Sequence, residues 1–309
     1  MDNLCHTLVG AAFGEAGLKR RTASGNVTLM IASNLPDVDV LVFATDLPSV
    51  AFRRGWTHGV LAQALLPVVL AGLMVLVGRL RRERQNHDSR GAALHRGGFA
   101  QLLFLSYIGV LTHVAMDWLN NYGVRLLMPF SGRWFYGDSV FIIDPWLWLT
   151  LGTGVWLARR WTRERPARIA LLVATLYIAA MVLSARAARA IVLDRWRSER
   201  GGAPHALMVG PVPITPLRRT VIVDAGDHYE TGTFTWLPLD VRFDAASVAK
   251  HDRDRAVAAA RASDTRVRGV LVWARFPYFE IEPVANGTRV TVRDMRFGDR
   301  VGGVSTVVR

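Results

Sequence analysis

Histidine and aspartate residues at helical spacing close a long apolar run that begins near Phe99. His113 and Asp117 stand four residues apart at the end of this run. On a helix they lie one turn apart on the same face, so an imidazole and a carboxylate can converge on one point. Such a pair is costly at the end of a membrane-length segment unless it faces protein, water or a metal ion, which makes it a functional candidate. The alternative is a hydrogen bond along the helix surface.

A pair of aspartates follows a proline. Pro36 disfavours helical geometry at Leu35, so Asp37 and Asp39 are expected at a break in an apolar segment. In extended backbone, residues two apart point to the same side. We predict that both are metal ligands and catalytic, because one carboxylate could bridge metal ions while the other holds a histidine or acts as a general base. An Asx turn or a helix cap is the alternative.

Two further histidines complete the predicted ligand set. His58 ends the stretch Arg-Gly-Trp-Thr-His at 54–58, and His6 interrupts the first apolar run. His58 could instead lie at a membrane interface, and His6 could be a satisfied core histidine. Imidazole and carboxylate together suit zinc or another divalent transition metal. The predicted ligands are His6, Asp37, Asp39, His58, His113 and Asp117, and the predicted cofactor is a divalent metal ion, with Zn²⁺ favoured.

Four more residues are possible additions to this site, namely Asp138, Asp144, Asn120 and Tyr122. Asp144 precedes Pro145, a common arrangement at the start of a helix, so capping competes with metal binding. Asn120 and Tyr122 could orient ligands or substrate, or could simply build the turn before Gly123.

The composition indicates a membrane protein with a soluble tail. Of the 309 residues 51% are hydrophobic, and they concentrate before about residue 190. The net charge of +13 comes largely from arginines that flank apolar runs, as topology signals do, so no nucleic-acid partner is expected. We expect membrane lipids and a small-molecule or lipid substrate as partners. Cys5 is the only cysteine, which excludes an intramolecular disulfide and a cysteine-based zinc site. The first residues lack a basic region, so no cleaved signal peptide is expected.

The predicted fold class is mainly α: a multi-pass helical membrane domain over residues 1–200 that carries the metal site, then a small β-rich soluble domain over residues 201–309. Apolar segments lie at 4–18, 26–44, 60–78, 99–118, 142–158 and 169–184. In the tail, strands are predicted at 220–223, 266–275, 278–282, 289–297 and 304–308, with a single helix at 248–262 and a hairpin at Asn286-Gly287.

Alternating crossings place the basic stretches 19–21, 79–98 and 159–168 on one side of the membrane. Every acidic or imidazole candidate falls on the other side. By the positive-inside rule the basic loops are cytoplasmic and the site is extracytoplasmic. The arginines between 186 and 200 argue against this orientation, because they would lie on the outer face.

Four ordered stretches carry a resemblance to a known family. They are DNLCHT at 2–7, NLPDVD at 34–39, RGWTH at 54–58 and the pattern HxxxDxxNxYG at 113–123. Together they resemble the YdjM/YbcI-like family of inner-membrane, metal-dependent hydrolases, and the stretches 134–138 and 144–146 fit it as well. The resemblance covers residues 1 to about 160 and implies an inner-membrane location and a bound metal.

A more distant similarity is to zinc-dependent phospholipase C and related single-strand nucleases, helical enzymes whose zinc cluster activates water to attack a phosphodiester. This resemblance implies ligand roles for His6, Asp37 or Asp39, His58, His113 and Asp117. The further histidine that should follow HxxxD is absent, as is a later HxxxE. The predicted function is membrane-bound, metal-dependent hydrolysis of phosphoric esters or lipid-linked substrates. The alternatives are a metal transporter or sensor and a non-enzymatic membrane scaffold.

Overall fold

The computed structural model describes residues 1–46, 48–85, 98–298 and 303–309. The chain forms two compact units. The first comprises Met1–Asp39 and Arg54–Val182, and the second comprises Val40–Arg53 and Leu183–Arg309. Part of the predicted basic loop at 79–98 lies outside the described residues.

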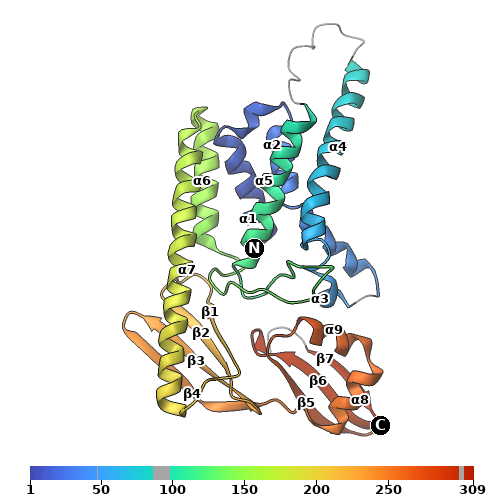
Figure 1. Ribbon diagram of the computed structural model, residues 1–309, viewed down its shortest axis with the longest axis vertical. Coiled ribbons are helices and arrows are strands. Elements are labelled where there is room, and N and C mark those ends of the chain that lie inside the picture. The colour runs from blue at the N-terminus through green and yellow to red at the C-terminus, as the bar shows by residue number, and fades with distance from the viewer. Residues whose placement is uncertain (47, 86–97, 299–302) are drawn as a thin grey trace. The chain divides into compact units, whose positions relative to one another are not determined.

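Helices build the first unit (Figure 1). They are α1 (Asn3–Glu15), η1 (Leu18–Arg21), α2 (Gly25–Ala32), the first half of η2 (Leu35–Ala44), α4 (Val60–Gln85), α5 (Phe99–Trp118), α6 (Pro145–Trp161) and the first half of α7 (Arg165–Arg200). The chain bends by 51° between α2 and η2, at the break predicted around Pro36. Among the described residues three helices, α4, α5 and α7, are long and apolar enough to cross a membrane, and the bent pair could form a fourth span.

Small residues let α2 pack closely between α1 and α5. A Cβ atom on Gly10 of α1 would lie 2.8 Å from the carbonyl oxygen of Leu29, and one on Gly109 of α5 would lie 2.4 Å from the Cβ of Ala32. The end of α2 is therefore held against both neighbours, and this fixes the start of the segment that carries Asp37.

The helix α7 is too long to lie wholly inside a bilayer. Its 36 residues span about 54 Å, against a hydrocarbon core of about 30 Å. In the second unit its later residues Ala188, Val192 and Trp196 are buried in one apolar core with β1, β2 and β3. The arginines between 186 and 200 thus lie on a helix packed against a sheet, which explains why they need not act as topology signals.

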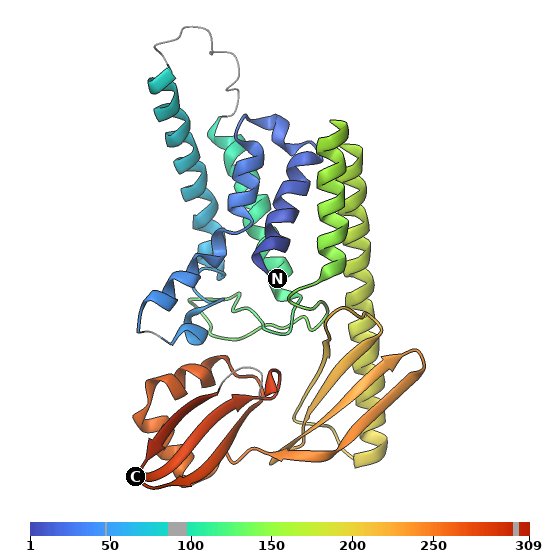
Figure 2. The ribbon, with the colours of Figure 1, turned by 180° about the vertical axis from the view of Figure 1, so that it is seen from behind.

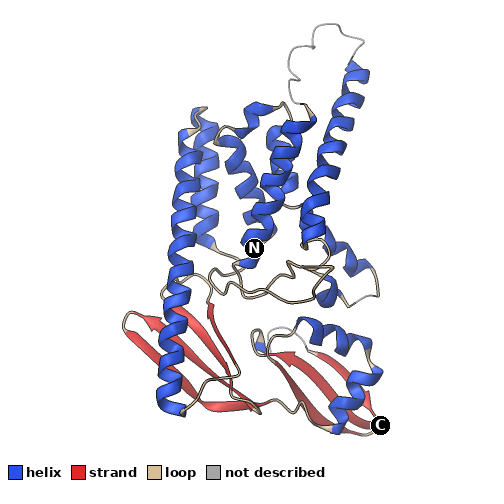
Figure 3. Cartoon of the chain, in the orientation of Figure 1, coloured by secondary structure: helices blue, strands red, loops and turns tan. Residues whose placement is uncertain are grey.

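Two antiparallel sheets make up most of the second unit (Figure 2, Figure 3). The first has the order β1 (Ala206–Pro211), β2 (Arg218–Asp224), β3 (His228–Trp236) and β4 (Leu239–Ala249). The second has the order β5 (Pro277–Val284), β6 (Gly287–Asp294) and β7 (Val304–Val308). The helices α8 (Arg255–Ser263) and α9 (Thr265–Trp273) cover the second sheet, and the short α3 (Ser49–Phe52) belongs to the same unit.

The predicted fold class is confirmed, but the strand predicted at 266–275 is wrong. These residues form α9, because Val267, Val270 and Leu271 recur at helical spacing and Asp264 caps the helix by accepting from the Arg266 backbone N–H. The prediction of a single helix in the tail is also wrong, since α8 and α9 both form. The hairpin at Asn286-Gly287 is confirmed by the pairing of Val284 with Gly287.

Candidate metal centre

Four buried side chains converge at one end of the helical unit. They are Asp37, His58, His113 and Asp117, and one ligand atom of each lies within 4.8 Å of all the others. The cluster is assembled from three parts of the chain: the α2–η2 break, the residues just before α4, and the last turns of α5. No single local segment could supply it.

The spacing of these ligand atoms is close to that of a metal-binding site. The two Nε2 atoms of His58 and His113 are 3.1 Å apart, and Asp117 Oδ2 lies 3.3 Å and 3.7 Å from them. Asp37 Oδ1 lies 3.8 Å from each Nε2. Metal–nitrogen bonds of about 2.0–2.1 Å in a tetrahedron place ligand atoms about 3.3–3.4 Å apart, so the cluster could hold a metal ion with small adjustments.

The Nδ1 atom of His58, which faces away from His113, is hydrogen-bonded to a threonine that is itself hydrogen-bonded to a carboxylate. Thr57 Oγ1 lies 2.9 Å from His58 Nδ1 and donates its single proton to Asp39 Oδ2 at 3.1 Å. The hydroxyl must therefore accept from His58 Nδ1–H, and this leaves a lone pair on Nε2. Asp39 Oδ2 also accepts from the Arg54 backbone N–H at 2.8 Å. Asp39 lies outside the four-residue cluster and orients the histidine that belongs to it.

The Nδ1 atom of His113 is also hydrogen-bonded, in this case to a backbone carbonyl. His113 Nδ1 lies 2.7 Å from the carbonyl oxygen of Ser33, an acceptor only, so Nδ1 carries the proton and Nε2 carries a lone pair. His6 stacks on His113 with ring centroids 3.8 Å apart, and its Nε2 lies 3.2 Å from Asp117 Oδ1. The α-amino group of Met1 also contacts this oxygen. His6 thus contacts two members of the cluster, His113 and Asp117, and is itself outside the four-residue group.

Arg54 is a buried residue beside the cluster that the sequence did not single out. Its Nε lies 2.9 Å from Asp117 Oδ2, its Nη1 donates to Asn120 Oδ1 at 3.0 Å, and its guanidinium lies 4.6 Å from the centroid of the Tyr122 ring. Asn120 and Tyr122 therefore orient Arg54 and lie outside the four-residue cluster. Arg54 also has a φ of 53°, which is uncommon for a residue with a side chain and typical of functional sites.

The two remaining candidates lie outside the four-residue cluster. Asp144 Oδ1 accepts from the backbone N–H groups of Trp146 and Leu147, and its Oδ2 accepts from the Tyr177 hydroxyl at 2.8 Å. Asp144 is the N-cap of α6, the competing interpretation of its position before Pro145. Asp138 lies in the loop between α5 and α6 with a φ of 48°.

The fold and the cluster together define a class: a helical membrane protein with a buried histidine and aspartate site that could bind a metal ion. Comparison with known families agrees. Residues 1–188 match the family described as YdjM inner membrane protein, so the chain belongs to this family and is an inner-membrane protein, as predicted.

A distant relative is the uncharacterized protein YfhP of Bacillus subtilis (strain 168), which is 21% identical over 169 residues. The match covers 51% of this chain and 47% of the relative, so the chain spans about half the length of the curated relative it matches. No solved structure matches the chain.

Proposed function

We propose that the chain is a membrane-bound, metal-dependent hydrolase that cleaves phosphoric esters of amphiphilic substrates. It uses one divalent ion, for which Zn²⁺ is the favoured candidate. One observation carries the proposal. Two buried imidazoles, each with its proton held on Nδ1, point their Nε2 lone pairs at each other across 3.1 Å between two carboxylates. A cation held by both lone pairs relieves this repulsion, and the two carboxylates beside them favour a divalent ion in that place.

The ion would be held by His58, His113, Asp37 and Asp117. When bound there, it supplies Lewis acidity and makes a water molecule nucleophilic near neutral pH. Asp37 combines the roles of ligand and general base, because Asp39 is already engaged with Thr57 and the Arg54 backbone. Arg54 holds Asp117 in place and puts a fixed positive charge beside the centre, where negative charge develops in ester hydrolysis.

A groove beside Asp37 supports an amphiphilic substrate. It has a volume of about 550 Å³ and is lined by α1, α2 and η2, with Met30, Ile31 and Val38 among its apolar residues. Asp37 belongs both to this groove and to the cluster. An acyl or isoprenoid chain in the groove would bring an attached ester to Asp37, and this favours lipid-linked substrates over fully water-soluble ones.

Metal analysis coupled to activity tests the proposal. The purified chain should contain one zinc per chain and hydrolyse a member of a panel of phospholipids and phosphodiesters after zinc is added back. His113→Gln and Asp117→Asn should each remove the metal and the activity while the protein still inserts into membranes. Asp144→Asn is the matched control, a buried aspartate outside the cluster, and should keep both.

Metal retained at full stoichiometry in both cluster variants would overturn the assignment of the site. Bound metal without turnover of any ester would overturn hydrolysis and favour a transporter or sensor.

A further inference from the structure

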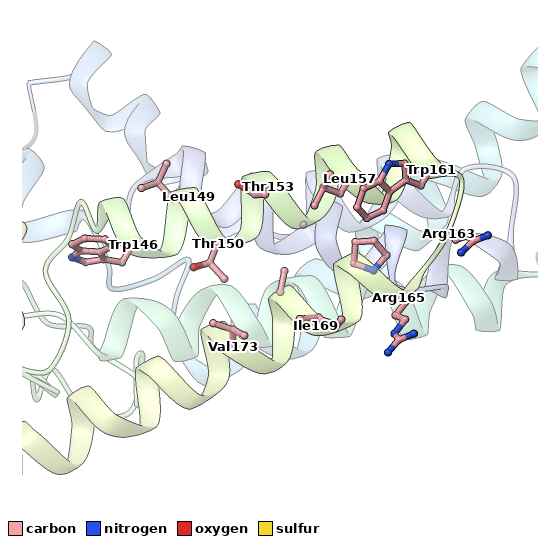
Figure 4. Close-up of a pocket in the computed structure, with 13 residues that line it drawn as sticks. Trp146, Leu149, Thr150, Thr153, Leu157, Trp161, Arg163, Arg165, Ile169 and Val173 are labelled. Carbon is pink, nitrogen blue, oxygen red and sulfur yellow. The ribbon is translucent and has the colours of Figure 1, made fainter.

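A second groove lies along α6 and α7. None of the residues that line it belongs to the metal cluster. It has a volume of about 730 Å³. Figure 4 shows Trp146 at one end and Trp161, Arg163 and Arg165 at the other, with Leu149 and Val173 among the apolar side chains between.

Close packing at one point forms the floor of this groove. A Cβ atom on Gly154 would lie 2.2 Å from the Cβ of Ala170, so the two helices approach closely there. The larger side chains on either side stand away from this contact and leave an apolar channel, and Leu149 and Ile169 remain 62% and 51% exposed. In a bilayer such a channel is filled by a hydrocarbon chain or by another helix.

The arginines at the α6–α7 turn favour a lipid over a second helix as the occupant of this channel. Arg159 pairs with Glu15, and Arg20 and Arg168 pair with Glu164. Within the described residues, the side chains of Arg163 and Arg165, which line the groove, have no ion-pair or hydrogen-bond partner. Two unpaired guanidinium groups at the end of an apolar channel complement a phosphate attached to an acyl chain, whereas a second apolar helix would leave them unsatisfied.

We propose that this groove binds one anionic phospholipid, with an acyl chain between α6 and α7 and the phosphate against Arg163 and Arg165. Trp161 marks the level of the head group, where amphipathic aromatic rings are favoured. The basic stretches assign this end of the unit to the cytoplasmic leaflet, whose lipids are anionic. The site is separate from the metal centre, and its lipid is a bound ligand and not a substrate.

Native mass spectrometry of the full chain in detergent tests the proposal, with dioleoyl-phosphatidylglycerol as the probe and dioleoyl-phosphatidylcholine as its neutral counterpart. One phosphatidylglycerol should bind at least about tenfold more tightly than phosphatidylcholine. The double variant Arg163→Gln/Arg165→Gln should lose this preference. Thr153→Trp, which fills the channel, should weaken binding of phosphatidylglycerol while the arginines remain.

Arg79→Gln/Arg81→Gln is the matched control, because it removes the same charge from α4, which ends at the same end of the unit as α6 (Figure 1). Its lipid preference should equal that of the wild type. An equal loss in both double variants would show general attraction to a basic surface and overturn the site. Equal binding of the two lipids, or a dimer that buries the groove, would overturn it as well.

Discussion

His58 Nε2 and His113 Nε2 lie 3.1 Å apart although 55 residues separate them in the chain. Each ring is turned toward the other by a partner on its opposite nitrogen, the Thr57 hydroxyl for His58 and the Ser33 carbonyl for His113. Both rings are therefore oriented by residues outside the four-residue cluster, and in metalloproteins the removal of such supporting contacts typically changes metal affinity by about 10–100-fold.

Asp39→Asn tests this supporting role. The amide is a weaker acceptor for the Thr57 hydroxyl and the Arg54 N–H, so the hold on His58 loosens. We expect metal affinity to fall by about 10–100-fold while a saturating metal concentration still gives the wild-type stoichiometry. Competition with a chromogenic chelator measures both quantities.

The exposed Asp46 provides the control for this variant, since Asp46→Asn removes the same charge from the surface and should leave affinity unchanged. A stoichiometry that falls at saturation in Asp39→Asn would instead make Asp39 a direct ligand.

Gly109→Ala should disturb the metal cluster, although Gly109 lies one helical turn before His113 on α5. The added Cβ would lie 2.4 Å from the Cβ of Ala32 and 2.8 Å from the Ser33 backbone nitrogen, so α2 must move away from α5. This shifts the Ser33 carbonyl that holds His113. We expect a loss of about 1–3 kcal/mol in the free energy of unfolding, together with weaker metal binding.

Gly72→Ala is the matched control for Gly109→Ala. A Cβ there meets nothing within 4 Å, and the residue lies inside α4, so alanine should leave metal binding unchanged and raise helix stability slightly. If both variants behaved alike in thermal unfolding and in metal titration, close packing of α2 on α5 would not be what positions His113.

Asp144→Ala separates capping from metal binding. The carboxylate caps α6 and accepts from the Tyr177 hydroxyl, so its removal should cost about 2 kcal/mol of stability. Metal content should remain at the wild-type level. Tyr177→Phe removes the hydrogen bond to Asp144 but leaves the cap in place, and should cost about 1 kcal/mol. Loss of metal from Asp144→Ala in a still-folded protein would contradict the capping role.

Local sequence patterns predicted much of the helical part of the fold. The apolar run that begins at Phe99 matches α5 to the last residue, and the proline rule placed the break before Asp37. Both follow from short stretches of sequence whose physical rules do not depend on distant partners. The segment that forms α9 shows the limit of this approach. Its β-branched residues favoured a strand, whereas the N-cap at Asp264 and the packing of residues at helical spacing stabilise a helix.

The candidate site could be predicted as a set of residue types but not as an arrangement. Arg54 looked like one of many arginines that flank membrane spans, and its role depends on Asn120, which lies 66 residues away. The division of labour between Asp37 and Asp39 was equally out of reach. It depends on which carboxylate contacts Thr57 and which contacts the two histidines, and these contacts arise only when η2, the residues before α4 and the end of α5 are brought together.

The cap of α9 should make the second unit sensitive to acid. Hydrogen bonds from the Arg266 guanidinium and backbone N–H lower the pKa of the Asp264 carboxyl from 3.8 to about 2. Because the folded-state pKa is the lower one, the ionised carboxylate stabilises the fold above pH 3.8, and this contribution is lost as the pH falls through about 2. Asp264→Asn should therefore weaken α9 at neutral pH and have no effect below pH 2.

Hydrogen exchange of the amides in α9, corrected for the intrinsic rate at each pH, measures this difference in the full chain. At neutral pH the variant should exchange faster than the wild type by an amount that corresponds to about 1 kcal/mol, because asparagine keeps the cap but loses the ion pair with Arg266 and the negative charge at the helix N-terminus. The two proteins should converge as the wild-type carboxylate becomes protonated. A difference that persists unchanged below pH 2 would assign the effect to the shape of the side chain and not to its charge.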